Sequence, residues 1–326
     1  MGIRENDKIA RVSLAVVASV YNEVEGLRAF NAKLLEVLNK MDVSFEVIFV
    51  NDGSRDGSDT VIEDIVKSNP AVCKSIHFSR NFGHEAAMIA GVDYASADAI
   101  VCMDADLQHP PESLPAMYEK FLSGTDIINM VREENDDNGF FKGMFSRVFY
   151  RMMNRISPVK LVENASDFFL ISHRVAEILR HDFRERNRFL RGFIQIVGFN
   201  KDTLSFHAVN RQFGKSKYSF WKLVKLSFNA IVSFSRVPLH LGMVAGIVFA
   251  IFTLIVGVYS IVMHIVGTPP PGYTTLVVLV SFAFSIQFFL IGFIGMYVGY
   301  NFEESKKRPI YIVERTDIDY SNDEVS

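Results

Sequence analysis

Two aspartates stand one residue apart where an apolar run ends. Residues 101–112 read VCMDADLQHPPE, so Asp104 and Asp106 directly follow apolar residues and precede a double proline. Carboxylates paired in one loop are typical ligands of Mg²⁺ or Mn²⁺, and a site with few protein ligands leaves room for a substrate diphosphate. The amide oxygen of Gln108 could add a third ligand. Such a pair also occurs by chance in acidic loops, so its meaning depends on where the fold places it.

A second polar loop, NDGSRDGS at residues 51–58, follows the apolar run FEVIFV. Asp56 or Ser58 can cap a following helix, and the two glycines permit unusual backbone angles, which alone explains most of the loop. The functional alternative is that Asp52 accepts hydrogen bonds from a nucleotide base or ribose. The loop is not a P-loop, because the chain has no GxxxxGK[ST], and no GxGxxG follows the first apolar run.

The elements around these loops predict an α/β fold. Short apolar runs alternate with amphipathic helical patterns in the first half of the chain. Strands are expected at 12–20, 45–50, 73–78 and 99–103, and helices at 23–40, 58–67, 84–94 and from 111 onward. Nearly all-apolar strands alternating with helices indicate a mostly parallel sheet covered on both faces. Ligands of such sheets bind beyond the carboxyl ends of the strands, so both polar loops are expected to border one crevice.

The second half of the chain contains two long segments without charge. Residues 241–266 and 274–298 include no Asp, Glu, Lys or Arg. As helices rising about 1.5 Å per residue, each can cross a hydrocarbon core of about 30 Å, whereas helices of a soluble core are rarely so long and uncharged. Basic residues precede the first segment and follow the second, while the turn GTPPPGY between them has none. The positive-inside rule therefore predicts a transmembrane hairpin with both termini cytoplasmic and the turn outside.

Four regions follow from this pattern. We expect a cytoplasmic domain at 1–210, a juxtamembrane helical segment at 211–238, the hairpin at 239–300 and a cytoplasmic tail at 301–326. The juxtamembrane segment contains YSFWKLVKLSFNAIVSF, whose apolar residues fit one helix face while its Trp and Lys residues suit lipid headgroups. An interfacial helix lying on the membrane and an ordinary packed helix both fit this pattern.

Composition excludes several classes of function. The net charge of −3 over 326 residues gives no basic field for nucleic acid. The two cysteines, Cys73 and Cys102, stand singly in apolar runs, which predicts buried thiols rather than a zinc site or a disulfide framework. The N-terminal run VSLAVVASV is short and lacks a cleavage site, so it predicts a buried strand rather than a signal peptide.

Several motifs, in this order along the chain, together resemble one family. They are VASVYNE, VNDGSRDGS, SRNFGHEAAMIAGVDYA, MDADLQHPPE, RFLRGF and RQFGKSKYSFWKL. The chain resembles the family 2 glycosyltransferases that charge polyprenyl phosphates, among them dolichyl-phosphate mannose synthases and bacterial undecaprenyl-phosphate glucosyl- and aminoarabinosyltransferases. The resemblance covers residues 12–313, including the hairpin.

This resemblance implies a GT-A fold and a metal-dependent enzyme of the plasma or inner membrane. The enzyme would transfer a hexose, with inversion, from a nucleotide-diphosphate sugar to a polyprenyl phosphate, for modification of cell-envelope glycans. Glucose from UDP-glucose is favoured by the bacterial relatives, while GDP-mannose and a UDP-amino sugar stay open, because no residue separates these donors. Homo-oligomerisation also stays open.

The resemblance carries roles to single residues. Tyr21, Glu23 and Asp52 are expected to line the nucleotide pocket, and Asp104, Asp106 and Gln108 to hold Mg²⁺ or Mn²⁺ on the donor diphosphate. Arg132 is expected by the phosphates and Asp167 near the sugar hydroxyls. The residues expected to meet the acceptor phosphate are Lys142, Ser146, Arg211 and Lys217. The expected catalytic set is Asp104, Asp106, Asp167, Arg132 and Arg211.

Five positions depart from the family pattern. Ser19 stands where VVPVYNE has proline, Asn51 replaces the first acid of DDGS, and Ser166 replaces the glycine of GDF. In the hairpin, Met296 and Tyr300 stand where relatives often carry Glu and Arg, so an ion pair there is not expected.

The expected chemistry needs no general base. A phosphate monoester has a second pKa of about 6, so the acceptor oxygen is already largely ionised at cytosolic pH. Two alternatives remain. A processive polysaccharide synthase would carry QxxRW, where this chain has RFLRGF, and more spans; a non-catalytic nucleotide-binding membrane scaffold would not need the intact aspartate pair.

Overall fold

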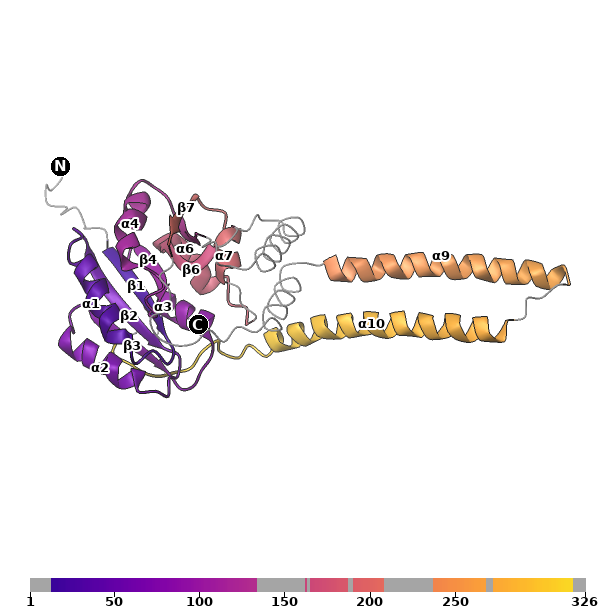
Figure 1. Ribbon diagram of the computed structural model, residues 1–326, viewed down its shortest axis with the longest axis horizontal. Coiled ribbons are helices and arrows are strands. Elements are labelled where there is room, and N and C mark those ends of the chain that lie inside the picture. Colours follow the sequence, from indigo (N-terminus) through magenta and orange to yellow (C-terminus); the bar gives the residue numbers. More distant parts are fainter. Residues whose placement is uncertain are drawn as a thin grey trace, which may run out of the picture. The chain divides into compact units, whose positions relative to one another are not determined.

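The computed structural model describes residues 13–133, 162, 165–186, 190–207, 237–267 and 272–318. The chain divides into two compact units. One is an α/β domain that includes residues from both sides of the C-terminal helices. The other contains those two long helices (Figure 1).

In the described part of the chain, eight strands form one mixed sheet with the order β7-β5-β6-β4-β1-β2-β3-β8. The central strands β1 (Ser13–Val20), β2 (Ser44–Asn51), β3 (Cys73–Phe78) and β4 (Ala99–Asp104) run parallel to one another. The flanking strands are β5 (Ile127–Arg132), β6 (Ala165–Ser172), β7 (Lys201–Phe206) and β8 (Val313–Thr316). Of these, β6 runs antiparallel to β4 and β5, and β8 runs antiparallel to β3. The expected α/β fold with a mostly parallel sheet is confirmed.

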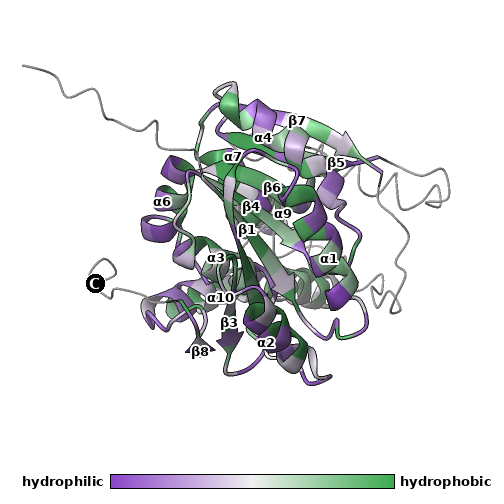
Figure 2. Cartoon of the chain, turned by 90° about the vertical axis from the view of Figure 1, so that its left-hand side faces the viewer, coloured by the Kyte–Doolittle hydropathy of each residue, from purple (hydrophilic) through white to green (hydrophobic). Residues whose placement is uncertain are grey.

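Helices cover both faces of this sheet. One layer contains α1 (Leu27–Leu38), α2 (Ser58–Ser68), the 3-10 turn η1 (Pro111–Ser113) and α4 (Leu114–Leu122). The apolar stripe of α1 packs in one buried cluster with alternate residues of β1, including Leu14, Val16 and Ala18. The other layer contains α3 (His84–Tyr94), α6 (His173–His181) and α7 (Leu190–Ile196). Figure 2 shows the result: the central strands are largely hydrophobic, while α2 and α6 carry broad hydrophilic areas.

The helix α3 lies unusually close to the sheet. It contacts β1, β2 and β4, and its residues 86–92 are all buried. A Cβ at Gly91 would lie 2.0 Å from Cγ1 of Val17, so only glycine permits this approach. The close packing fixes the position of His84, the first residue of α3.

The helix α1 is shorter than predicted. We expected a helix at 23–40, but α1 begins at Leu27, because the chain first forms a turn in which Asn22 has φ 56° and the Glu23 carbonyl accepts the N–H groups of Gly26 and Leu27. The helices α2 and α3 match their predicted ranges within one residue.

Residues beyond the second long helix return to the α/β domain, where a tail at 301–326 was expected. We call residues 311–318 the C-terminal strap. Its strand β8 pairs with β3, and the Ile312 carbonyl accepts the N–H of Ser79 at 3.1 Å. The ring of Tyr311 stacks on Phe78 with centroids 5.1 Å apart. Strand β8 is short, with the four residues VERT, and mostly polar, as is usual for an edge strand. Its sequence therefore has no apolar pattern that would predict a strand.

The second unit consists of α9 (Val237–Ile265) and α10 (Tyr273–Ser305), which contact each other, for example through Phe249 and Phe282. Both are long and apolar enough to cross a membrane, over Gly246–Ile265 and Val278–Ser305. Their described side chains are largely exposed rather than packed in a protein core, which is compatible with membrane anchoring. The two predicted apolar helices are therefore confirmed, and their orientation stays a prediction. Residues 211–236 of the expected juxtamembrane segment lie outside the described residues.

Candidate active site

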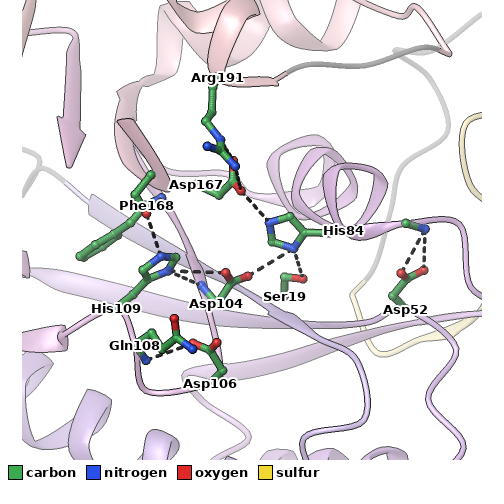
Figure 3. Close-up of polar contacts among 12 residues, drawn as sticks. Ser19, Asp52, His84, Asp104, Asp106, Gln108, His109, Asp167, Phe168 and Arg191 are labelled. Atoms are coloured by element: carbon green, nitrogen blue, oxygen red, sulfur yellow. Dashed lines mark hydrogen bonds and ion pairs between the residues drawn. The ribbon is translucent and has the colours of Figure 1, made fainter. Parts of the chain in front are cut away.

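The paired carboxylates lie at the carboxyl end of the parallel strands. Asp104 is the last residue of β4, where it pairs in register with Ser19 on β1. The Ala105 N–H then bonds to the Ser19 carbonyl, after which the chain turns through Leu107 with φ 63°. The Asp106 carboxylate accepts the N–H of Gln108 at 3.0 Å, which fixes the turn (Figure 3). Burial raises the pKa of Asp104, and the nearby histidines oppose this shift.

Arg132 and Gln108, both expected in the site, are brought together. Arg132 ends β5, two strands away from β4, and its Nη2 donates to Gln108 Oε1 at 2.8 Å. The amide oxygen expected to bind a metal thus has an arginine partner in this structure.

His109 supports Asp104 from the backbone side. Its Nδ1 accepts the Asp104 N–H at 2.9 Å, so its Nε2 carries the proton and donates to Ser166 Oγ at 2.8 Å. The ring also stacks on Phe168, and burial lowers the pKa of His109, which keeps it neutral. Ser166, which replaces the glycine of the family pattern, therefore has a definite partner.

Asp167 on β6 is held by Arg191 on α7. Arg191 donates from Nε to Oδ1 and from Nη2 to Oδ2, the latter at 2.7 Å. Burial opposes ionisation, but Arg191 and His84 outweigh it and hold the pKa of Asp167 well below its usual range. Asp167 is therefore a fixed anion and a poor proton acceptor. Glu85 helps to place this arginine, because its carboxylate accepts the N–H of Leu190 at 3.0 Å where α7 begins.

His84 lies between the two carboxylates of β4 and β6. Its Nδ1 is 3.0 Å from Ser19 Oγ and 3.2 Å from Asp104 Oδ1, and its Nε2 is 3.6 Å from Asp167 Oδ2 (Figure 3). Burial disfavours the charged ring, but Asp104 and Asp167 outweigh it and raise the pKa of His84 to about 9.

Asp52 anchors the loop that leads to His84. Its carboxylate accepts hydrogen bonds from Asn81 Nδ2 at 2.9 Å, from the Phe82 N–H at 2.7 Å and from the Gly83 N–H at 3.0 Å. The side chain is buried, at 1% exposure, and burial raises its pKa while these N–H groups oppose the shift. The geometry assigns Asp52 a supporting role in the loop, and its expected contact with a nucleotide stays a proposal.

Tyr21 and Glu23 lie on a loop tied to the NDGSRDGS turn. The N–H groups of Asn22, Glu23 and Val24 bond to side chains of that turn, namely Ser54, Ser58 and Asp56. Tyr21 is 47% exposed, so its ring is free to meet a ligand, as the nucleotide-pocket expectation requires.

The residues present fit a divalent metal held jointly with a substrate. Among the described residues, no group of three or more His, Cys, Asp or Glu side chains could hold an ion alone. Two carboxylates in one loop, with an amide oxygen beside them, are instead the donor set that Mg²⁺ uses when phosphates and waters complete its coordination.

Four expected site residues fall outside the described part of the chain: Lys142, Ser146, Arg211 and Lys217. Three site residues were not assigned from the sequence, although each stands in a motif that carried the resemblance: His84, His109 and Arg191. No spacing rule marks a single histidine or arginine, so only the strand order reveals that they surround Asp104 and Asp167.

Comparison with known proteins agrees with this site. Residues 15–179 match the family described as Glycosyl transferase family 2. A prophage bactoprenol glucosyl transferase homolog of Escherichia coli is 36% identical over 93% of this chain and 99% of its own length. The bactoprenol glucosyl transferase of Shigella phage SfV is 35% identical over 93% and 98%, and an uncharacterized glycosyltransferase of Synechocystis is 34% identical over 93% and 95%.

Solved structures are more distant. Glucosyl-3-phosphoglycerate synthase from Mycobacterium tuberculosis, in complex with Mn²⁺, UDP-glucose and phosphoglyceric acid, has a TM-score of 0.45 and 14% identity, over 68% of this chain and 78% of that one. The family match and the near full-length relatives show that the chain belongs to glycosyl transferase family 2.

Proposed function

We propose that this enzyme transfers a hexose, with glucose favoured, from a nucleotide-diphosphate sugar to a polyprenyl phosphate at the cytoplasmic membrane surface, with inversion at the anomeric carbon. The names of the bactoprenol glucosyl transferases of Escherichia coli and Shigella phage support glucose and a polyprenyl acceptor. The observation that carries the proposal is the position of Asp104 and Asp106 at the carboxyl end of the parallel strands.

The donor side of the reaction uses the loop after β4. Asp104 and Asp106 would hold Mg²⁺ or Mn²⁺, with Gln108 as a further oxygen ligand. A bound divalent ion there supplies positive charge that stabilises the departing nucleotide diphosphate. Arg132, already bonded to Gln108, extends this positive charge toward the phosphates through charge-assisted hydrogen bonds.

The sugar side of the reaction uses Asp167. Because Arg191 keeps its carboxylate ionised and fixed, Asp167 can accept hydrogen bonds from sugar hydroxyls without taking their protons. The attacking phosphate is already anionic near pH 7, so no side chain has to act as a general base. The same reasoning distinguishes this enzyme from transferases that must deprotonate a sugar hydroxyl.

The acceptor explains the two apolar helices. A polyprenyl tail stays in the bilayer, so its phosphate is reachable only at the membrane surface. Helices α9 and α10 would hold the catalytic domain there more firmly than one lipid chain could. Lys142, Ser146, Arg211 and Lys217 remain the proposed contacts of the acceptor phosphate, through charge-assisted bonds.

The test is a donor screen with the full-length protein. Purified protein in undecaprenyl-phosphate micelles receives labelled UDP-glucose, GDP-mannose or a UDP-amino sugar, with Mn²⁺, Mg²⁺ or a chelator. We expect label in the organic-extractable lipid, strongest with UDP-glucose and absent with the chelator. A water-soluble polymer would instead support a polysaccharide synthase, and no product with any donor would support a scaffold. Either result would overturn the proposal.

A further inference from the structure

We propose that His84, seated by Ser19, is a positioning residue that fixes the metal-binding carboxylate of Asp104 and separates it from Asp167. This inference rests on the proposed function, because it assigns His84 a role toward the ion that Asp104 and Asp106 would hold. The carrying observation is that one ring contacts three groups from three strands: Ser19 on β1, Asp104 on β4 and Asp167 on β6.

His84 is held in place from both sides. Its backbone begins α3 directly after Gly83, whose φ of 104° is a conformation that L side chains rarely adopt. The N–H of Gly83 bonds to the buried carboxylate of Asp52. On the other side, the buried Ser19 hydroxyl meets Nδ1 at 3.0 Å, and Ser19 is also the register partner of Asp104. The ring thus has little freedom to turn away.

Each nitrogen of the His84 ring faces a carboxylate. Nδ1 lies 3.2 Å from Asp104 Oδ1, and Nε2 lies 3.6 Å from Asp167 Oδ2. The Nε2 contact of 3.6 Å is too long for a hydrogen bond, and this nitrogen is buried without a partner at bonding distance in the described structure. The site therefore holds an unused hydrogen-bonding position that faces Asp167.

The second oxygen of Asp104 stays available for an ion. In the described part of the chain, Oδ2 faces the ring of His109, whose Nδ1 is 3.8 Å away and already accepts the Asp104 N–H. His109 therefore cannot donate to Oδ2 from that nitrogen. Because His84 Nδ1 contacts Oδ1 at 3.2 Å, Oδ2 is the oxygen of Asp104 that we assign to the cation.

The departure at Ser19 fits this role. Proline, which the family pattern has at this position, has no hydroxyl to place beside His84. Partners that orient a metal ligand typically change metal affinity about 10-fold to 100-fold when they are mutated. A purely structural histidine at the start of α3 would instead lower stability and leave the affinity for the ion unchanged.

The test measures Mn²⁺ binding separately from turnover. Full-length protein in detergent, with UDP present, is titrated with Mn²⁺, and the free ion is followed by its electron paramagnetic resonance signal. Variants are His84→Leu, which removes both nitrogens, His84→Gln, which keeps one donor, and Ser19→Ala. The matched control is His181→Gln, an exposed histidine on α6 of the same domain.

We expect His84→Leu to weaken Mn²⁺ binding at least about 10-fold, His84→Gln and Ser19→Ala to weaken it less, and the control to match the wild type. If His84→Leu does not fold, the other two variants decide. If the folded His84 and Ser19 variants bound Mn²⁺ with an affinity within twofold of the wild type, this inference would be overturned and the proposed function would not. A wild-type protein that neither binds Mn²⁺ nor transfers sugar would overturn the proposed function as well.

Discussion

Arg191 binds both carboxylate oxygens of Asp167, with its Nη2 2.7 Å from Oδ2 and its Nε donating to Oδ1. This pair joins α7 to β6. A third donor from the same guanidinium, Nη1, bonds to the Ala165 carbonyl at 3.0 Å. A two-point arginine contact fixes the plane of the carboxylate as well as its charge.

The Asp167–Arg191 pair should make stability depend on acid. Its carboxyl has a folded-state pKa below the unfolded value of about 3.9, so the pair stabilises the fold above about pH 4. This contribution is lost as the pH falls below 4 toward the folded-state pKa. We expect Arg191→Ala to lower the free energy of unfolding by about 3 kcal/mol at pH 7 and to make it depend less on pH below pH 4. Denaturant unfolding from pH 3 to 7 measures both effects.

The control for this experiment is Arg28→Ala. Arg28 pairs with Asp64 on the surface, where both side chains are largely exposed, so its loss should cost no more than about 1 kcal/mol. If the free energy of unfolding varied with pH in the same way and by a similar amount in Arg191→Ala and Arg28→Ala, the Asp167–Arg191 pair would not be the source of the acid dependence.

Neutralising the paired acids should remove transfer and leave the fold intact. We expect Asp104→Asn and Asp106→Asn each to lower the initial rate of lipid glycosylation about 10³-fold, because several kcal/mol of charge stabilisation is lost. Burial already disfavours the charged form of Asp104, so its unfolding midpoint should not fall. Glu119→Gln on the exposed surface of α4 serves as the control. Wild-type turnover of the double variant in chelator would contradict the metal role.

Arg211 should act on the acceptor rather than the donor. The residue lies outside the described part of the chain, so the expectation rests on its motif, RQFGKSKY. We expect Arg211→Ala to raise the KM for polyprenyl phosphate about 10-fold, through loss of a charge-assisted bond, with the KM for the nucleotide-sugar unchanged. An unchanged response to the lipid would remove Arg211 from the site.

A methyl group at Gly91 should push α3 away from the sheet. The added Cβ would lie 2.0 Å from Val17 Cγ1, so we expect Gly91→Ala to destabilise the domain by about 1–3 kcal/mol. Shortening the opposing side chain should restore part of this loss in the double variant Gly91→Ala/Val17→Ala. Unfolding midpoints of the four proteins in this cycle measure the coupling, and strictly additive effects would speak against a direct clash.

The C-terminal strap should support the nucleotide side of the site. Tyr311 donates to Asp93 Oδ2 at 2.7 Å and stacks on Phe78, which meets Phe82 edge-on, and the Phe82 N–H bonds to Asp52. We expect Tyr311→Phe to cost about 1 kcal/mol, and Tyr311→Ala about 2–4 kcal/mol with a severalfold higher KM for the donor.

The matched control for the C-terminal strap is Arg308→Ala, three residues upstream of Tyr311. This substitution should leave both the stability and the KM for the donor unchanged. A Tyr311→Ala protein that unfolds earlier but binds the donor normally would limit the strap to a role in stability.

The sequence predicted the central strands because their runs are apolar on both faces. The expected strand at 73–78 coincides with β3, and those at 12–20, 45–50 and 99–103 end within one residue of β1, β2 and β4. The apolar run at 99–103 also predicted that Asp104 lies at the end of a strand. The flanking strands β5, β6, β7 and β8 were not predicted. Strands β7 and β8 are partly exposed, and β6 begins with the polar residues Ser166 and Asp167 after one alanine.

The surroundings of the carboxylates could not be predicted from the sequence. His84, Asp104 and Asp167 are separated by 20 and 63 residues and meet only because β6 inserts between β4 and β5 in reverse direction. Likewise, a role for the hydroxyls of Ser19 and Ser166 can be recognised only from the histidines that they contact, His84 and His109. These are consequences of topology, which local residue patterns do not encode.

The pairing of β8 with β3 has a consequence for biosynthesis. Residues 313–316 leave the ribosome only after both apolar helices have been made, so the edge of the catalytic sheet stays open while the hairpin is being synthesised. The sheet is complete only once translation has passed α9 and α10. Completion of the catalytic domain therefore requires prior synthesis of the segment that is expected to hold it at the lipid.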